Sequence, residues 1–76
     1  MKFSELKEYL DEHAVFGLTA KKRKKTIIYF FRRYYVKIEL SLKVKVDRET
    51  KEVISVICKD KVYTDFDDIK KLVERK

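Results

Sequence analysis

Residues 34–46, YYVKIELSLKVKV, contain the strongest structural pattern in the chain. From position 36 onward, aliphatic side chains occupy every even position, and charged or polar side chains occupy every odd one. A period of two is typical of a β-strand with one buried and one solvated face. The stretch therefore predicts a half-buried strand whose lysines project from the solvated face.

The segments on either side of this stretch also predict strands. Residues 26–31 (TIIYFF) are β-branched and aromatic. A single strand from 26 to 46 would be exceptionally long, so we expect a turn or bulge near Arg32–Arg33. Beyond the stretch, residues 47–51 (DRETK) predict a hairpin connection to a returning strand at 52–59 (EVISVICK).

Amphipathic patterns predict a helix at each end of the chain. Over residues 3–13 the apolar stripe is Phe3, Leu6 and Leu10, with Ser4 as the expected N-cap. Near the other end, Thr64 and Asp67 have the spacing of a capping box. The stripe that follows consists of Phe66, Ile69, Leu72 and Val73.

Two shorter segments complete the expected fold. Residues 14–20 hold the only glycine and are expected to turn the chain, with a short strand as the alternative. Residues 61–63 are expected to extend the strand before them past a kink at Asp60. The 76 residues thus predict one small α+β domain of order α–β–β–β–α, with an antiparallel sheet of three strands, or four as the alternative. We expect both helices on one face of the sheet and water on the other.

The excess positive charge is confined to one third of the chain. Residues 21–46 carry ten Lys and Arg against one acid, Glu39, whereas residues 1–20 sum to −2 and residues 47–76 to zero. The same segment holds five of the aromatic residues. Concentrated charge interleaved with aromatic rings is typical of a surface that binds a polyanion.

These residues define a candidate nucleic-acid interface without catalytic or metal-binding residues. We expect Lys21–Lys25 to form a solvated loop or helix end, and Tyr29 and Tyr35 to stack on bases, whereas Phe30, Phe31 and Tyr34 are expected in the core. If the strand phase continues upstream, Arg33 and Tyr35 share the lysine-bearing face. The full candidate set is Lys21, Lys22, Arg23, Lys24, Lys25, Tyr29, Arg32, Arg33, Tyr35, Lys37, Lys43 and Lys45.

Other side chains that could carry chemistry have simpler structural interpretations. His13 is expected to end the first helix, and Cys58 to fill space in the core. Asp65, Asp67 and Asp68 are expected to stabilise a helix N-terminus rather than to bind a metal. We therefore expect no enzyme and no cofactor, although RNA cleavage through His13 is an open alternative.

The sequence predicts a small basic protein that binds DNA or RNA through phosphate contacts with little sequence specificity. The chain lacks Asn and Gln, the side chains that read adenine. The main alternative is a protein-binding or oligomeric regulator, such as a virus-encoded one, whose basic patch docks an acidic partner. We expect that its long strand could pair edge to edge in a homodimer. Binding to an anionic membrane surface is a further alternative.

Composition also indicates a cellular context. A single cysteine excludes an internal disulfide and indicates a reducing, cytoplasmic compartment. The longest apolar run, residues 27–31, is too short to insert across a membrane. Abundant Lys and Glu without Asn or Gln are typical of thermophile proteins.

Overall fold

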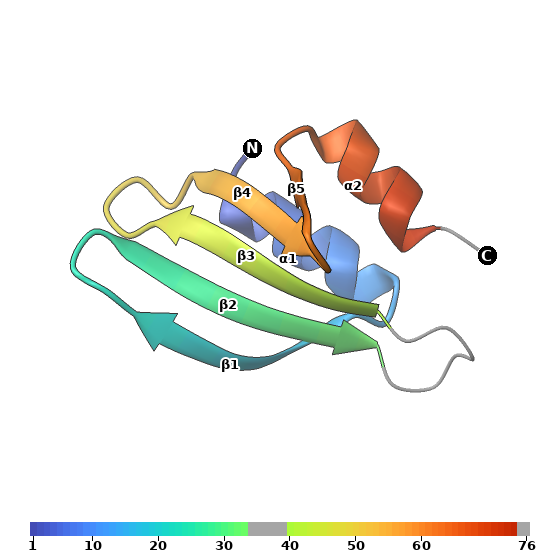
Figure 1. Cartoon of the computed structure of the whole chain (residues 1–76), viewed down its shortest axis with the longest axis horizontal. Helices are drawn as coiled ribbons and strands as arrows, with labels where there is room; N and C mark the ends of the chain where they lie inside the picture. The colour runs from blue at the N-terminus through green and yellow to red at the C-terminus, as the bar shows by residue number, and fades with distance from the viewer. Residues whose placement is uncertain (34–39, 75–76) are drawn as a thin grey trace.

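The computed structural model describes residues 1–33 and 40–74 and has one helix at each end of a five-stranded antiparallel sheet (Figure 1). Each strand pairs with the next one along the chain, so the order in the sheet is β1-β2-β3-β4-β5. The elements are α1 (Phe3–Glu12), β1 (Phe16–Lys22), β2 (Thr26–Arg33), β3 (Leu40–Asp47), β4 (Val53–Cys58), β5 (Lys61–Tyr63) and α2 (Phe66–Val73).

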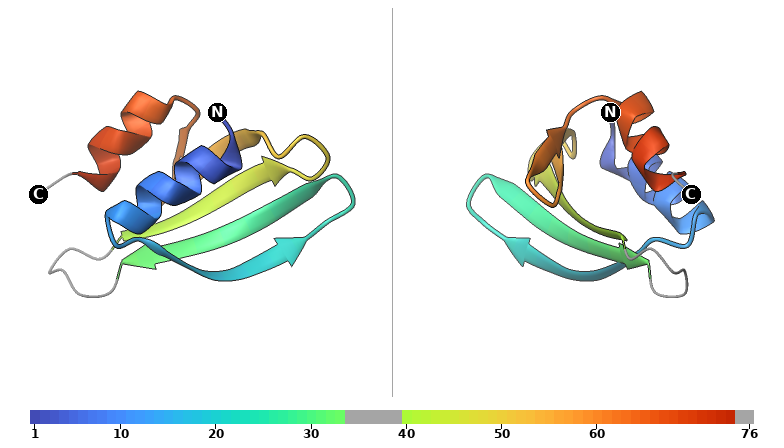
Figure 2. Two further views of the ribbon diagram at one scale, coloured as in Figure 1. Left: turned by 180° about the vertical axis from the view of Figure 1, so that it is seen from behind. Right: turned by 45° about the vertical axis from the view of Figure 1, so that its right-hand side comes forward.

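Both helices lie against the same face of the sheet, as predicted, and the core fills the space between the two layers (Figure 2). The even positions of β3 are its buried ones, and Leu42, Val44 and Val46 are at most 2% exposed. From the helices, Leu6 and Leu10 of α1 and Ile69 and Val73 of α2 close the core. Each such side chain contributes about 1.5–3 kcal/mol through burial.

The number of strands differs from the prediction because two short segments pair as strands. Residues 14–20 were expected to turn the chain, with a short strand as the alternative, and the alternative is correct because Phe16–Lys22 form β1; Lys61–Tyr63 form β5. Cys58 pairs with Lys61, so the chain folds back at this point instead of extending β4. Lys59 has a positive φ of 57°, which allows this tight reversal.

The prediction that the run of residues 26–46 is interrupted near Arg32–Arg33 is confirmed, because β2 ends at Arg33, β3 begins at Leu40 and the two strands pair antiparallel. β2 continues through both arginines, and Arg33 pairs with Leu40 at the start of β3. The β3–β4 hairpin is confirmed, and the Asp47 carboxylate accepts hydrogen bonds from the main-chain N–H groups of Glu49 and Thr50 at 2.9 and 3.0 Å. These bonds hold the pKa of Asp47 below its usual value.

The N-cap residue of each helix differs from the predicted one by one or two positions. The N-cap of α1 is Lys2, not Ser4, and Lys2 forms a β-bridge to Glu52. The main-chain N–H of Phe3 donates to the main-chain carbonyl of Lys51 at 3.0 Å, so a tertiary hydrogen bond replaces the side-chain cap. At α2 the cap is Asp65, whose carboxylate accepts from the N–H of Asp67 at 3.0 Å.

Candidate nucleic-acid interface

The register of the sheet assigns each strand residue to one of two faces, because directly paired residues point to the same side. Ile27, Tyr29, Phe31 and Arg33 of β2 pair with the buried positions of β3 and face the helices. The opposite face, here called the open face, has no helix over it (Figure 2). Its side chains are Phe16, Thr19, Lys21, Ile28, Phe30, Arg32, Ser41, Lys43, Lys45, Ser55, Ile57 and Val62.

Cationic and apolar side chains alternate across the open face. One row runs from Lys21 through Ile28 to Lys45, and the next runs from Phe30 through Lys43 to Ile57. Lys43 and Lys45 are exposed, as predicted from the alternation of β3. Lys21 on β1 lies two strand spacings of about 4.8 Å from Lys45 on β3, so the three lysines share one face of the sheet with apolar side chains between them.

The basic run at residues 21–25 continues this surface at one end of the sheet. Lys21 and Lys22 belong to β1, contrary to the expected loop, and residues 23–25 connect β1 to β2. All five side chains are exposed. Arg48 of the neighbouring hairpin fixes the connection, because its guanidinium donates to the carbonyl of Arg23 at 3.0 Å and its N–H to that of Lys25 at 2.9 Å. Sequence reasoning missed Arg48 because only the fold brings the two hairpins together.

Three of the predicted interface residues lie on the covered side of the sheet instead. Lys22 pairs with Ile27 and so has the register of that side, although its side chain is exposed. Tyr29 stacks on Phe3 of α1, with the ring centroids 4.1 Å apart. Arg33 donates to the carbonyls of His13 and Val73 at 3.1 and 3.0 Å, so it joins the ends of both helices. The prediction for Arg33 extended the alternation of β3 back along the chain, whereas Arg33 in fact belongs to β2 and pairs with buried Leu40. Tyr34, Tyr35 and Lys37 lie outside the described residues.

The prediction for Phe30 was wrong in the opposite direction, from the core to the open face. It was expected in the core, but it is half-buried on the open face, with the ammonium of Lys43 at 5.8 Å from its ring centroid. Phe31 is 2% exposed and belongs to the core, as predicted. The aromatic side chain offered by the described part of β2 to an external partner is therefore Phe30.

The strands contain almost no negative charge to oppose these cations. Asp47 is the only acidic residue in the five strands as described, and its carboxylate is bonded within the β3–β4 turn. The ion pairs found in residues 1–33 and 40–74 join the N-terminus and Lys2 to Glu52, and Lys7 to Asp11. Lys21, Lys43 and Lys45 are not among them, so no carboxylate of residues 1–33 and 40–74 forms an ion pair with these three lysines.

The residues considered for other chemistry have internal roles. Cys58 is 7% exposed in the core. His13 ends α1, where its Nδ1 lies 2.9 Å from the carbonyl of Tyr9. Burial raises the pKa of the Tyr9 phenol, and its hydrogen bond to Glu74 raises it further. In the described ranges, no three His, Cys, Asp or Glu side chains are placed to hold a metal ion.

Two further observations complete the description. Over residues 1–33 and 40–74, no helix has the length and apolar character needed to cross a membrane. Comparisons of the chain with protein-family models, with curated proteins and with solved structures found no match.

Proposed function

We propose that this protein binds nucleic acid through its open face and the adjoining β1–β2 connection, mainly by contacts with the phosphate backbone. The observation that supports this most directly is the position of Lys21 on β1 and of Lys43 and Lys45 on β3, all on one uncovered face of the sheet. A polyanion laid across this face meets these cations on two strands, and the exposed Arg23, Lys24 and Lys25 extend the contact beyond the end of the strands.

The same geometry argues for weak sequence preference. Lysine ammonium groups contact phosphates as point charges and carry no base information. The flat or gently twisted surface of a sheet also offers no helix to enter a major groove. Affinity should therefore depend on charge number and on ionic strength more than on sequence.

Fluorescence anisotropy with labelled DNA and RNA, single- and double-stranded, tests the proposal. If six to ten phosphates are contacted, affinity should fall roughly 10³- to 10⁵-fold between about 50 and 200 mM salt. Neutralising Lys21, Lys43 and Lys45 to Gln should weaken binding and reduce the slope of log K against log salt by about 2–3.

The matched control is a second triple Lys-to-Gln variant, which has the same net charge as the first. Lys7, Lys61 and Lys71 are also exposed, but they lie on α1, on the opposite register of β5 and on α2. The triple Gln variant at these positions should bind like the unmodified protein. Equal losses in the two triple variants, or no binding at low salt, would overturn the proposal.

A protein-binding or oligomeric role is the second candidate, and the edge strand β1 favours it. The long strand expected to form a dimer cannot do so along β3, which is paired on both sides. β1 has one unpaired edge and exposes Phe16 and Leu18, each at 47%. Molar mass measured by light scattering over a range of protein concentrations separates this role from nucleic-acid binding.

A further inference from the structure

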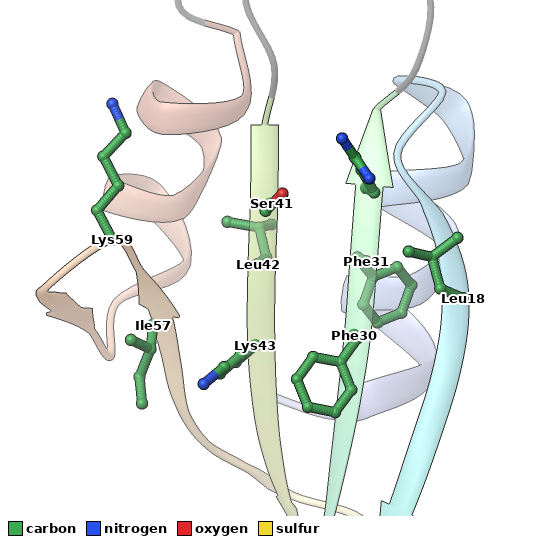
Figure 3. Close-up of a pocket in the computed structure, with 9 residues that line it drawn as sticks. Leu18, Phe30, Phe31, Ser41, Leu42, Lys43, Ile57 and Lys59 are labelled. Atoms are coloured by element: carbon green, nitrogen blue, oxygen red, sulfur yellow. The ribbon is translucent and has the colours of Figure 1, made fainter.

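The open face is hollowed where β1, β2, β3 and β4 run side by side (Figure 3). The depression has a volume of about 340 Å³, near the lower end of the range for ligand sites. It is lined by Leu18, Phe30, Phe31, Arg32, Ser41, Leu42, Lys43, Ile57 and Lys59. No acidic residue is among them.

An aromatic ring between two aliphatic side chains forms the apolar part of this depression. Phe30 comes from β2, Ile57 comes from β4, and Leu18 comes from the edge strand β1 (Figure 3). Leu18 lies at a β-bulge, because the register of β1 shifts between Gly17 and Thr19. The bulge adds an apolar side chain beside Phe30 that a regular strand would not place there.

Cationic side chains lie within and beside this apolar part. Lys43 and Lys59 are exposed, and the guanidinium-bearing side chain of Arg32 also lines the depression. Lys43 places its ammonium 5.8 Å from the Phe30 ring centroid. Because a lysine stem is flexible, this ammonium can leave the ring for a phosphate when another flat group takes its place.

An aromatic ring with lysine ammonium groups near it fits one class of ligand, and this class is consistent with the proposed function. A phosphate alone makes no use of Phe30, Leu18 and Ile57, and a purely apolar ligand makes no use of Lys43 and Lys59. A nucleotide with an exposed base face uses both parts. In a duplex the base faces are covered by their stacked neighbours, so an aromatic side chain reaches them only in unpaired strands.

We infer that the depression is a stacking site for an unpaired base, and that the protein prefers single-stranded nucleic acid to duplex. This inference rests on the proposed function. Phe30 stacks on the base beside Leu18, while Lys43, which lies between Phe30 and Ile57, and Lys59 contact the neighbouring phosphates.

The test compares single-stranded oligothymidine of about 16 nucleotides with a duplex of the same length. Replacing Phe30 by Leu removes the ring but keeps an apolar side chain. It should weaken single-strand binding about 5- to 150-fold and leave duplex binding and the salt slope unchanged. The matched control is Phe66→Leu, which removes a half-buried ring of α2, on the other side of the sheet. It should leave both affinities unchanged.

A direct spectroscopic signal comes from Phe30→Trp, because the chain contains no other tryptophan. Oligothymidine should quench this fluorescence, whereas inorganic polyphosphate should bind without quenching it. Circular dichroism checks that each variant is folded.

The outcomes separate the two proposals. Equal affinity for both strand forms with no effect of Phe30→Leu overturns the stacking site and leaves phosphate binding intact. Absence of binding to any oligonucleotide overturns both.

Discussion

The covered and open faces of β2 and β3 are built from the same alternating backbone but have opposite chemistry. On the covered face, Leu42, Val44 and Phe31 are buried against two helices. On the open face, one residue away, Phe30, Lys43 and Lys45 combine a ring with positive charge and have no covering element. One face accounts for the stability of the fold, and the other is available for a partner. Substitutions on the two faces should therefore affect different measurements.

The largest expected difference is between neighbouring residues of β3. Leu42→Ala removes buried methyl groups and should lower the free energy of unfolding by about 2–5 kcal/mol. Lys43→Ala should change it by about 0.5 kcal/mol or less, because the side chain is exposed. Urea denaturation measures both. Similar losses for the two variants would show that the open face is covered in solution.

The next expected effect concerns Arg33, which was predicted in the interface but bonds to the ends of both helices. Arg33→Ala leaves two carbonyls without this donor and should cost about 1–3 kcal/mol of stability. The folded variant should bind oligonucleotides as the unmodified protein does. A large loss of affinity at unchanged stability would return Arg33 to the interface.

Tyr29 and Phe30 are adjacent in sequence and sharpen the contrast further. Tyr29→Leu removes the stacked pair with Phe3 and should cost about 0.5–1.5 kcal/mol beyond the lost area, without changing affinity. Thermal unfolding and anisotropy on the same samples check this. Phe30→Leu should show the reverse pattern, with reduced affinity and little change in stability. If both variants changed stability and affinity in the same way, the assignment of Tyr29 and Phe30 to opposite faces would be contradicted.

The smallest expected effect is a pH dependence from Asp47. Its folded pKa lies below the unfolded value, so its stabilising contribution is complete above about pH 4 and is lost as the pH falls through the folded pKa. Asp47→Asn keeps a carbonyl acceptor that does not titrate. The melting temperature of the variant should therefore fall less between pH 5 and pH 2.5, as measured by calorimetry. Parallel curves would show that other carboxylates dominate.

Sequence reasoning succeeded where burial leaves a regular pattern. β3 and α2 have one apolar face each, and their alternation or stripe identified Val44, Val46, Ile69 and Val73 as core. β1 has no such pattern, because all of its residues are exposed and only β2 pairs with it. A strand of this kind is defined by its main-chain partner and not by its own side chains.

The sequence predicted the exposure of the basic side chains better than the face of the sheet on which each residue lies. Residues 26–31 have apolar side chains on both faces of β2, so nothing in them decides whether Phe30 or Phe31 points inward. A register shift of one residue moves a side chain to the other face. This explains why Arg33 and Phe30 were each assigned to the wrong side, whereas Lys43 and Lys45 were assigned correctly.

The acidic surface of α1 has a consequence for the rate of binding. Glu5, Glu8, Asp11 and Glu12 are exposed on this helix, on the side of the sheet away from the basic face (Figure 2). A polyanion repels one side of such a molecule and attracts the other, so the protein is turned before the surfaces touch. Fewer collisions are then wasted on the wrong orientation. If the open face binds nucleic acid as proposed, the charge on this remote helix helps to orient the encounter without touching the bound strand.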